Sequence, residues 1–500
     1  MNIANLINRR DLTAIVLLAL LLLLLLSCST KPKDGSISGN VVLSNDSGDP
    51  AYDTMDLSGV KVSLYNTVLL DSTILRLNQE YPNIGVIINQ ETEFKQKNQT
   101  AFKTAITDAT GFFVFDQIPM GEYNLVFEKD GWGRVFRYNI KPNTESRSSL
   151  FDVFNEDDRR IMLKKDEVKS LTVVMYPIQI LNSTIYNSFS FEADHCYRVM
   201  SDAYMYGECI FEGRSRIEVQ AGSIINLYSD VISSGEGYCT IETYDDGSSS
   251  GQSKWDSMCV YSSNNVLTSF IITDSNAGIV FWGSGNEVSN SIIRKSNSGV
   301  HPVGLNTIIC NVIFQDISNR AVLLEQSAGQ ESISFTLEKS ILFKCVEGIR
   351  TMGNAVSIKN NYFLENDISV FSFNGFHEIR NNNFDRNNRV LICAGTIIPI
   401  EYNNFYQGNA NGILFSYQYY SNVSNPLLNY NNFYMTSGLV IELHSRTTIS
   451  NIDAKNSYWA APDIDAMIWD RNDSQDISHF VEYLPVRFQA VATAGIIETK

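Results

Sequence analysis

Residues 357–394 read SIKNNYFLENDISVFSFNGFHEIRNNNFDRNNRVLICA, and one unit of sequence occurs twice within them. Phe363 and Phe384 each close a short apolar run, and Asn360 and Asn381 each lie three positions earlier. A second apolar run follows each closing residue after a turn. A period near 21 with such short runs does not suit a sandwich, whose strands recur through hairpin turns. It predicts a coil in which every turn is one repeat.

The same unit extends from about residue 265 to residue 459. The apolar closing residues are Ile272, Ile293, Phe314, Phe343, Phe363, Phe384, Phe405, Phe433 and Trp459, at sequence steps of 21, 21, 29, 20, 21, 21, 28 and 26. A small polar residue lies three positions before most of them: Ser269, Asn290, Asn311, Ser340, Asn360, Asn381 and Asn456, with Asn403 and Asn431 shifted by one. Stacked turns place parallel strands about 4.8 Å apart. An Asn at the same place on successive turns can therefore hydrogen-bond to the next one.

This repeat resembles the right-handed parallel β-helix, the coil of the pectate-lyase-like and NosD-like proteins. The resemblance covers roughly residues 195–460, and Val219–Ile225 (VQAGSII) resembles the segment that opens such coils. We predict a coil over residues 179–460 and, over residues 461–500, a cap that covers its free strand edges. The fold hosts enzymes, adhesins and inert stalks, so the resemblance predicts the fold and leaves the activity open.

Residues 1–28 predict an export signal. Arg9 and Arg10 precede a 15-residue apolar run from Leu12 to Leu26, which is shorter than a membrane-spanning helix requires. The run ends in Leu25-Leu26-Ser27-Cys28, which resembles the bacterial lipobox, where the signal is cut before a cysteine that then carries lipid. A simple signal peptide and an uncleaved anchor are the alternatives.

The lipobox resemblance implies that Cys28 is acylated and that the membrane lipid is a partner of the chain. Residues 29–34 then form a polar tether. The expected location is the outer membrane, with the protein facing either the periplasm or the cell surface.

Residues 35–178 predict a β-sandwich, because runs such as SISGNVVL, GVKVSLYN and SLTVVMYP alternate between apolar and polar residues with turn signals between them. The stretch Thr107–Trp132 resembles the carboxypeptidase regulatory-like domain, a transthyretin-like sandwich. Its pattern T-D-x-x-G-x-F-x-F-x-x-x-P-x-G-x-Y-x-L matches from Thr107 to Leu125. That resemblance implies an accessory spacer. The insertion Asp71–Gln99 departs from the pattern and contains a candidate helix around residues 75–81.

The composition excludes some partners. The formal net charge is −17, with 38 Lys and Arg against 55 Asp and Glu. Nucleic acid binding requires clustered basic residues, so it is excluded, and acidic polysaccharides would need a bridging cation. No zinc-like Cys or His spacing occurs, and no metal or cofactor is predicted.

The eight cysteines suggest two disulfides. Cys196 and Cys209, and likewise Cys239 and Cys259, are close enough in sequence to pair in an oxidising envelope. Sequence alone does not fix the pairing. Three others, Cys310, Cys345 and Cys393, fall among apolar strand residues, which predicts buried free thiols.

A search for catalytic motifs finds none that is complete. Hydrolases of the coil family carry N-x-D, an Asp pair, G-H-G and R-x-K, whereas its lyases hold calcium with several carboxylates beside a basic residue. This chain has no G-H-G and no R-x-K, and Asn451–Asp453 matches N-x-D without its partners. No catalytic residue is therefore predicted. The alternative is a polysaccharide lyase or glycoside hydrolase with a divergent site, and Ca²⁺ enters as a cofactor only if it is a lyase.

One charged column accompanies the repeat. The residues two positions past the closing residues are Asp274, Lys295, Asp316, Cys345, Glu365 and Arg386. They are either a substrate or cation site, or a ladder of opposite charges stacked about 5 Å apart. The alternation of sign favours the ladder, since a calcium site would cluster acids.

Aromatic residues supply the candidate binding site. Phe415, Tyr417, Tyr419 and Tyr420 either stack sugar rings on an outer turn or shield a long loop. Trp132 is a further candidate, with a place in the sandwich core as its alternative. The whole chain is thus expected to be an all-β, envelope-anchored surface lipoprotein, and a non-catalytic role is favoured over an enzymatic one. Its coil is expected to bind carbohydrate or another extracellular partner, or to act as a stalk.

Overall fold

The computed structural model describes residues 35–44, 56–141, 171–244, 254–325, 334–352, 355–373, 377–394, 399–416, 426–444 and 451–497. The chain forms two compact units. Within the described residues, the first unit contains residues 35–44, 56–68, 94–130, 134–141 and 171–175. The second contains Leu69–Glu93, Gly131–Gly133 and the described residues from Tyr176 onward.

The first unit is the predicted β-sandwich. One sheet has the order β4-β1-β7 and the other the order β3-β2-β5-β6. The strands are β1 (Gly35–Leu43), β2 (Lys61–Asn66), β3 (Lys103–Ile106), β4 (Phe112–Ile118), β5 (Tyr123–Glu128), β6 (Val135–Ile140) and β7 (Leu171–Met175), with a short 3₁₀ turn η3 (Gln96–Asn98). The ring of Phe113 on β4 meets the ring of Phe127 on β5 edge to face, with centroids 5.5 Å apart. The inner faces of the two sheets therefore interdigitate.

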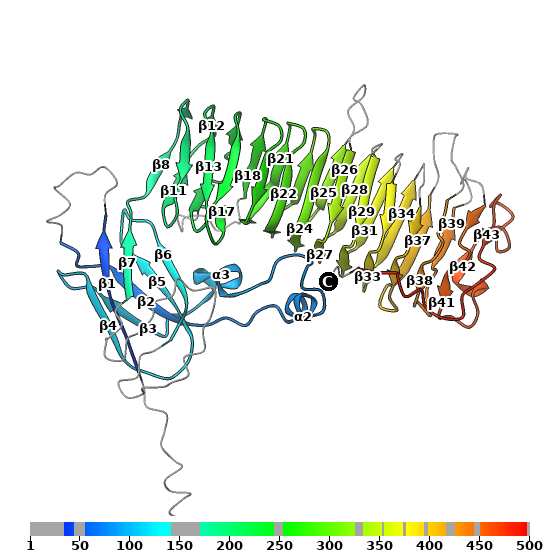
Figure 1. Cartoon of the computed structure of the whole chain (residues 1–500), viewed down its shortest axis with the longest axis horizontal. Helices are drawn as coiled ribbons and strands as arrows, with labels where there is room; N and C mark the ends of the chain where they lie inside the picture. Colours follow the sequence, from blue (N-terminus) through cyan, green and yellow to red (C-terminus); the bar gives the residue numbers. More distant parts are fainter. Residues whose placement is uncertain are drawn as a thin grey trace, which may run out of the picture. The chain divides into compact units, whose positions relative to one another are not determined.

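The second unit is a right-handed parallel β-helix, as the repeat period predicts, and its strands follow one another in chain order along one axis (Figure 1). One 13-stranded sheet, called wall 1 below, has one strand per turn. Wall 1 consists of β9 (Thr184–Ile185), β12 (Ala203–Met205), β15 (Ile225–Leu227), β18 (Trp255–Val260), β21 (Ser275–Phe281), β23 (Ser298–Pro302), β25 (Arg320–Glu325), β28 (Glu347–Met352), β31 (Ile368–Phe373), β34 (Arg389–Ala394), β37 (Asn411–Phe415), β39 (Ile441–Leu443) and β42 (Ile468–Trp469).

A 21-stranded parallel sheet forms the rest of the coil. Its strands are β8 (Gln179–Leu181), β10 (Phe189–Phe191), β11 (Cys196–Val199), β13 (Cys209–Glu212), β14 (Arg216–Val219), β16 (Val231–Ser234), β17 (Cys239–Thr243), β19 (Val266–Thr268), β20 (Phe270–Thr273), β22 (Glu287–Arg294), β24 (Thr307–Gln315), β26 (Ser334–Glu338), β27 (Ile341–Phe343), β29 (Ala355–Lys359), β30 (Tyr362–Leu364), β32 (His377–Arg380), β33 (Asn383–Asp385), β35 (Ile400–Glu401), β36 (Asn404–Phe405), β38 (Asn432–Phe433) and β41 (Tyr458–Trp459). Near the C-terminus, β40 (Ile452–Asp453) pairs with β43 (Val481–Glu482), and η4 (Asp465–Met467) leads into β42.

One closing residue differs from the sequence prediction. Leu342 pairs with Phe314 on the turn before and with Phe363 on the turn after, so Leu342 closes this turn. Phe343 instead belongs to an apolar cluster on the outside of the coil. Both residues are large and apolar, and the long insertion in this turn hides the register. With Leu342 in place, the step to Phe363 equals the step from Phe363 to Phe384, as a regular repeat requires.

The asparagine ladder lies one residue after its predicted position at Asn360 and Asn381, and at the predicted position in the turns of Asn403 and Asn431. Asn311 donates to Asn290 at 3.5 Å, as predicted. Asn360 and Asn381 adopt left-handed backbone conformations, with φ of 53° and 57°, and turn the chain at a corner. Left-handed backbone costs energy for most residues, and Asn tolerates it best after Gly. The next residues, Asn361 and Asn382, point inward and stack.

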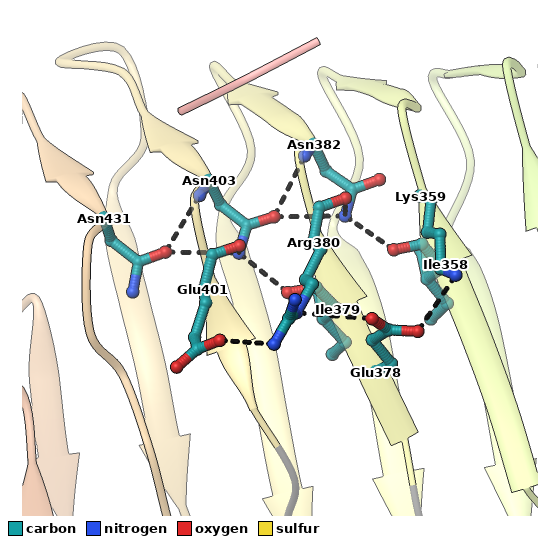
Figure 2. Close-up of polar contacts among 9 residues, drawn as sticks. All are labelled: Ile358, Lys359, Glu378, Ile379, Arg380, Asn382, Glu401, Asn403 and Asn431. Carbon is teal, nitrogen blue, oxygen red and sulfur yellow. Dashed lines mark hydrogen bonds and ion pairs between the residues drawn. The ribbon is translucent and has the colours of Figure 1, made fainter. Parts of the chain in front are cut away.

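The buried ladder runs through Asn361, Asn382, Asn403 and Asn431. The Oδ1 of Asn403 accepts from both the backbone N and the Nδ2 of Asn382, at 2.9 and 3.1 Å (Figure 2). The Nδ2 of Asn403 also donates to the carbonyl of Ile379, at 2.9 Å. Each amide therefore satisfies buried backbone groups of its own turn and of the adjoining ones.

A second ladder, which was not predicted, lies at another corner. Asn366 donates to Asn387, and Asn387 donates to Asn409, each at 3.0 Å between amide nitrogen and oxygen. A third corner carries the pair Asn265 and Asn286, at 2.8 Å. Stacked amides thus close three corners of the coil.

The insertion that the sequence assigned to the sandwich belongs to the coil. Residues Leu69–Glu93 form α2 (Ser72–Glu80), where the sequence predicts a helix, and α3 (Gln90–Glu93). They cover an outward-facing apolar column, and α2 lies alongside the coil (Figure 1). The joint cluster consists of Ile74, Leu77, Ile84, Val86 and Ile88 from the insertion and Ile271, Ile292, Ile313, Ile341, Phe343, Tyr362 and Leu364 from the coil. None of the described helices is long and apolar enough to cross a membrane.

The C-terminal segment covers the continuation of that column. The column passes from Tyr362 to Asn383, Asn404 and Asn432. Val491 donates its backbone N–H to Asn432 at 2.7 Å and accepts from the same amide at 3.0 Å. Gly495, at φ +85°, lies so close to Asn404 that a Cβ would collide with the side-chain amide.

We expect Asn403→Leu to destabilise the coil strongly. The substitution removes the acceptor of Asn382 and the donor to Ile379. Each buried polar group left unpaired costs about 1–3 kcal/mol, so the total loss should reach at least about 3 kcal/mol. Urea unfolding measures it as a lower midpoint. Asn388→Ala, at an exposed position one residue past the second ladder, should change the midpoint little, and equal effects of both variants would contradict the ladder.

Candidate functional site

Five aromatic side chains form a row along one edge of wall 1. In the first five turns, the residue that follows the last inward-facing residue of the wall-1 strand is aromatic. These residues are Tyr186, Tyr206, Tyr228, Tyr261 and Trp282, called the aromatic row below. Because side chains alternate along a strand, the residue after an inward one points outward. The exposed fraction accordingly runs from 36% for Tyr261 to 75% for Tyr186.

The five rings stack on one another along the coil. Successive ring centroids are 5.5, 4.7, 4.5 and 6.0 Å apart, and the ring planes differ by only 13°, 9°, 6° and 5°. The coil repeat sets this spacing, since neighbouring parallel strands lie about 4.8 Å apart. The row is therefore built in advance and does not need to order itself when a ligand arrives.

The corner beside the row fixes its last two rings. Ser262 and Gly283 directly follow Tyr261 and Trp282 in the chain, and Asn286 donates to both of their carbonyls, at 3.0 and 2.9 Å. Gly283 lies against the carbonyl of Ser262, where any Cβ would collide. The turns that directly follow Tyr261 and Trp282 are short.

The rings differ in what they offer to a ligand. The three inner tyrosines have neighbours on both faces, so they present their edges and hydroxyl groups. Tyr186 and Trp282 end the row, and among the described residues each has one face without an aromatic neighbour. The next turn places Val303 beside Trp282. Aromatic faces and hydroxyl groups together suit the apolar faces and hydroxyl groups of sugars.

Polar groups on the same face of wall 1 add hydrogen-bonding capacity. The hydroxyl of Tyr261 donates to the Oδ1 of Asn226 at 3.3 Å, and burial raises the pKa of Tyr261 to about 12, so it stays protonated at neutral pH. The charge of Asp202 raises the pKa of Tyr204.

The opposite edge of wall 1 has a shallow cavity of about 470 Å³. Its lining residues are Met200, Ser201, Asp202, Gln220, Ala221, Gly222 and Ser223. Asp202, Ser201 and Ser223 supply oxygen atoms to it. The row and the cavity are thus the two edges of one outward face.

The aromatic residues predicted from sequence are not brought together. Phe415 is fully buried in the coil core, because it pairs with Cys393 and Leu443 at an inward position. Trp132 is only 8% exposed and bridges to Pro177. Neither can act as a sugar platform, which corrects the prediction. Tyr417, Tyr419, Tyr420 and the lipidation residue Cys28 lie outside the described residues.

The predicted disulfides are absent, since Cys209 and Cys239 are free thiols. Both belong to the interior core, whereas their predicted partners, Cys196 and Cys259, lie outside that cluster. Alternation along a strand explains the difference: Cys196 precedes the inward Tyr197, and Cys259 follows the inward Met258. The two members of each pair thus point to opposite sides of the coil wall.

The charged column is present with one correction. Lys344, not Cys345, shares the left-handed corner conformation of Glu365 and Arg386, with φ of 55°, 53° and 54°. The column therefore alternates strictly in sign. Glu365 lies 4.0 Å from Lys344 and 3.0 Å from Arg386, as expected for a charge ladder.

A second charged row was not predicted. Glu378 binds Lys359 at 3.0 Å and Arg380 at 3.2 Å, and Arg380 also binds Glu401 at 2.6 Å (Figure 2). Burial raises the pKa of Glu401. These acids are paired with bases, and among the described residues no three His, Cys, Asp or Glu side chains are arranged to hold a metal ion.

The aromatic row was not predicted, although the sequence contains a signal for it. Tyr206 and Tyr228 follow Tyr186 at close to the repeat period, and Trp282 follows Tyr261 by one period. The step from Tyr228 to Tyr261 is much longer than the period, because a polar insertion lies between them. That step breaks the pattern at the centre of the row.

Comparisons with known proteins add little. No protein-family model and no curated protein matches the chain. Among solved structures, the family 28 exopolygalacturonase of Yersinia enterocolitica aligns over 92% of this chain and 98% of its own. The sequence identity is 11% and the TM-score is 0.28, values too low to bear on activity.

The native chain should resist alkylation at Cys209 and Cys239. Both side chains are in the core, and burial raises the pKa of each thiol to about 12. Iodoacetamide at pH 8, followed by mass spectrometry, should leave both unmodified until urea is added. Cys310, which is only half-buried, should react first. A Cys196–Cys209 or Cys239–Cys259 cross-link in the oxidised protein would contradict the structure.

Proposed function

We propose that this chain is an envelope-anchored surface lipoprotein that binds carbohydrate through the aromatic row of its β-helix, with the sandwich as a spacer. The observation that carries the proposal is the exposed, stacked row from Tyr186 to Trp282. Five large aromatic side chains placed outward on five successive turns are unusual on a protein surface without a partner.

The shape of the row supports a linear glycan as the ligand. An extended polysaccharide repeats one sugar unit along its length, and the row repeats one ring per turn. Phenol hydroxyl groups at a fixed spacing can bond to successive sugars, while the outer face of Tyr186 and the exposed part of the Trp282 ring stack on the ends of the bound segment. Aromatic rings with polar tips lose little side-chain freedom when they bind.

Two sequence features support the cellular setting of the proposal. Leu25–Cys28 resembles a lipobox, and the sandwich resembles the carboxypeptidase regulatory-like spacers. A lipid on Cys28 would hold the coil at the membrane, where it meets extracellular or periplasmic glycans.

Trp282→Ala should weaken glycan binding by up to about tenfold, because one aromatic contact contributes about 0.5–1.5 kcal/mol. Tyr186→Ala should have a similar effect at the other end of the row. A glycan array, followed by calorimetry on each hit, measures the change. Phe488→Ala removes an aromatic side chain that is 95% exposed outside the row, and it should leave the affinity unchanged.

The glycans that bind on the array should not be cleaved by the protein. Release of reducing ends, or absorbance from unsaturated products, would replace the binding proposal with a lyase or hydrolase. An array without hits, or binding that ignores Trp282→Ala, would overturn the role of the row.

Cys28→Ser tests the anchor. The unchanged chain should incorporate labelled fatty acid and sediment with outer membranes, whereas the variant should remain unlabelled. Labelling that survives the substitution, or a mature N-terminus elsewhere than residue 28, would contradict acylation at Cys28. A double variant with Trp282→Ala should show that anchoring and glycan binding are independent.

A further inference from the structure

We infer that the aromatic row selects glycans without anionic groups, either neutral or amino-bearing. This inference rests on the proposed function and names the class of ligand. The turns that carry the row, residues 184–285, contain thirteen acidic and four basic residues. Acids therefore outnumber bases in these turns, which gives this part of the coil a net negative charge.

The four basic side chains of these turns are already bound elsewhere. Arg198 lies 3.0 Å from Glu218, and Arg214 lies 3.1 Å from Asp194. Arg216 pairs with Glu242, and the Nζ of Lys254 donates to Asn297 at 2.7 Å. The three arginines come from the 21-stranded sheet or its adjoining turns, not from wall 1.

Acidic residues, by contrast, flank the row directly. Glu208 and Asp230 each lie two residues past a row tyrosine, at the same place on successive turns, since Cys209 pairs with Val231. Two carboxylates about one strand spacing apart add their potentials at the edge of the row. Asp230 is exposed and Glu208 partly so, and within the described residues neither forms an ion pair.

Further acids lie across the same face. Asp202 lines the cavity at the far edge of wall 1. Asp256 lies beside this cavity, because its backbone N–H donates to the carbonyl of the lining residue Ser223 at 3.0 Å. A uronate or sulfate group would therefore meet carboxylates on both sides of its path. The hydroxyl groups of a neutral sugar would find hydrogen-bond acceptors there. The protonated amino group of an amino sugar would be attracted to the same carboxylates.

The experiment compares three hexasaccharides of different charge on the full-length chain in detergent. Xylohexaose is neutral, a glucosamine hexamer is cationic and a galacturonic acid hexamer is anionic. Calorimetry at pH 6 and 150 mM NaCl gives each dissociation constant. We expect the galacturonate hexamer to bind at least about tenfold more weakly than the other two.

Glu208→Gln/Asp230→Asn should narrow that difference by about fivefold, because two charges beside the row disappear. The matched control is Asp367→Asn/Asp476→Asn, which removes two exposed acids from later parts of the coil unit and should leave all three affinities unchanged. Lower salt should widen the affinity difference between the neutral and anionic hexamers for the unchanged chain, and widen it less for the Glu208/Asp230 variant.

Two kinds of failure are distinguishable. If the galacturonate hexamer binds as tightly as xylohexaose and Trp282→Ala weakens both, the charge selection is overturned while the row remains a glycan site. If no hexamer binds, or none responds to Trp282→Ala, the proposed function itself is overturned and this inference with it.

Discussion

The coil depends on amide groups that hydrogen-bond from one turn to the next. Asn382 donates both its backbone N–H and its side-chain amide to Asn403, and Asn403 repeats this toward Asn431. A corner leaves backbone groups unpaired inside the wall, where water cannot reach them. An Asn side chain is short enough to fit there and carries both a donor and an acceptor. The amide ladder therefore fixes the height of each turn relative to its neighbours.

A fixed register converts single residues into surface rows. Each outward position repeats about every 4.8 Å, so its chemistry accumulates along the axis. Aromatic residues at one position give the exposed row of wall 1, and alternating charges at another give the ladder of Glu365 and Arg386. Isoleucines at a third position would be exposed if nothing covered them. The insertion that contains α2 packs on them. Insertions lengthen the connections between walls without moving these positions.

The aromatic row and the charged rows have different consequences. Paired charges such as Arg380 and Glu401 neutralise each other and leave little to bind a ligand. The row from Tyr186 to Trp282 is exposed and has no covering segment among the described residues. The row is flanked by the acidic side chains of Glu208 and Asp230. In this fold, a functional site is expected on such a surface feature and not in the regular coil that carries it.

The sequence by itself determined the class of fold and the order of the domains, because a period near 21 and strand alternation are local properties. It also placed the charge ladder and the helix in the insertion. It did not decide which of two adjacent residues points inward, as at Leu342 and Phe343 or at Asn360 and Asn361. A shift of one residue reverses the facing of a strand side chain, and hydrogen bonds between turns set that register. The tertiary structure alone therefore placed Phe415 in the core and brought Tyr228 beside Tyr261, across an insertion that separates them in the chain.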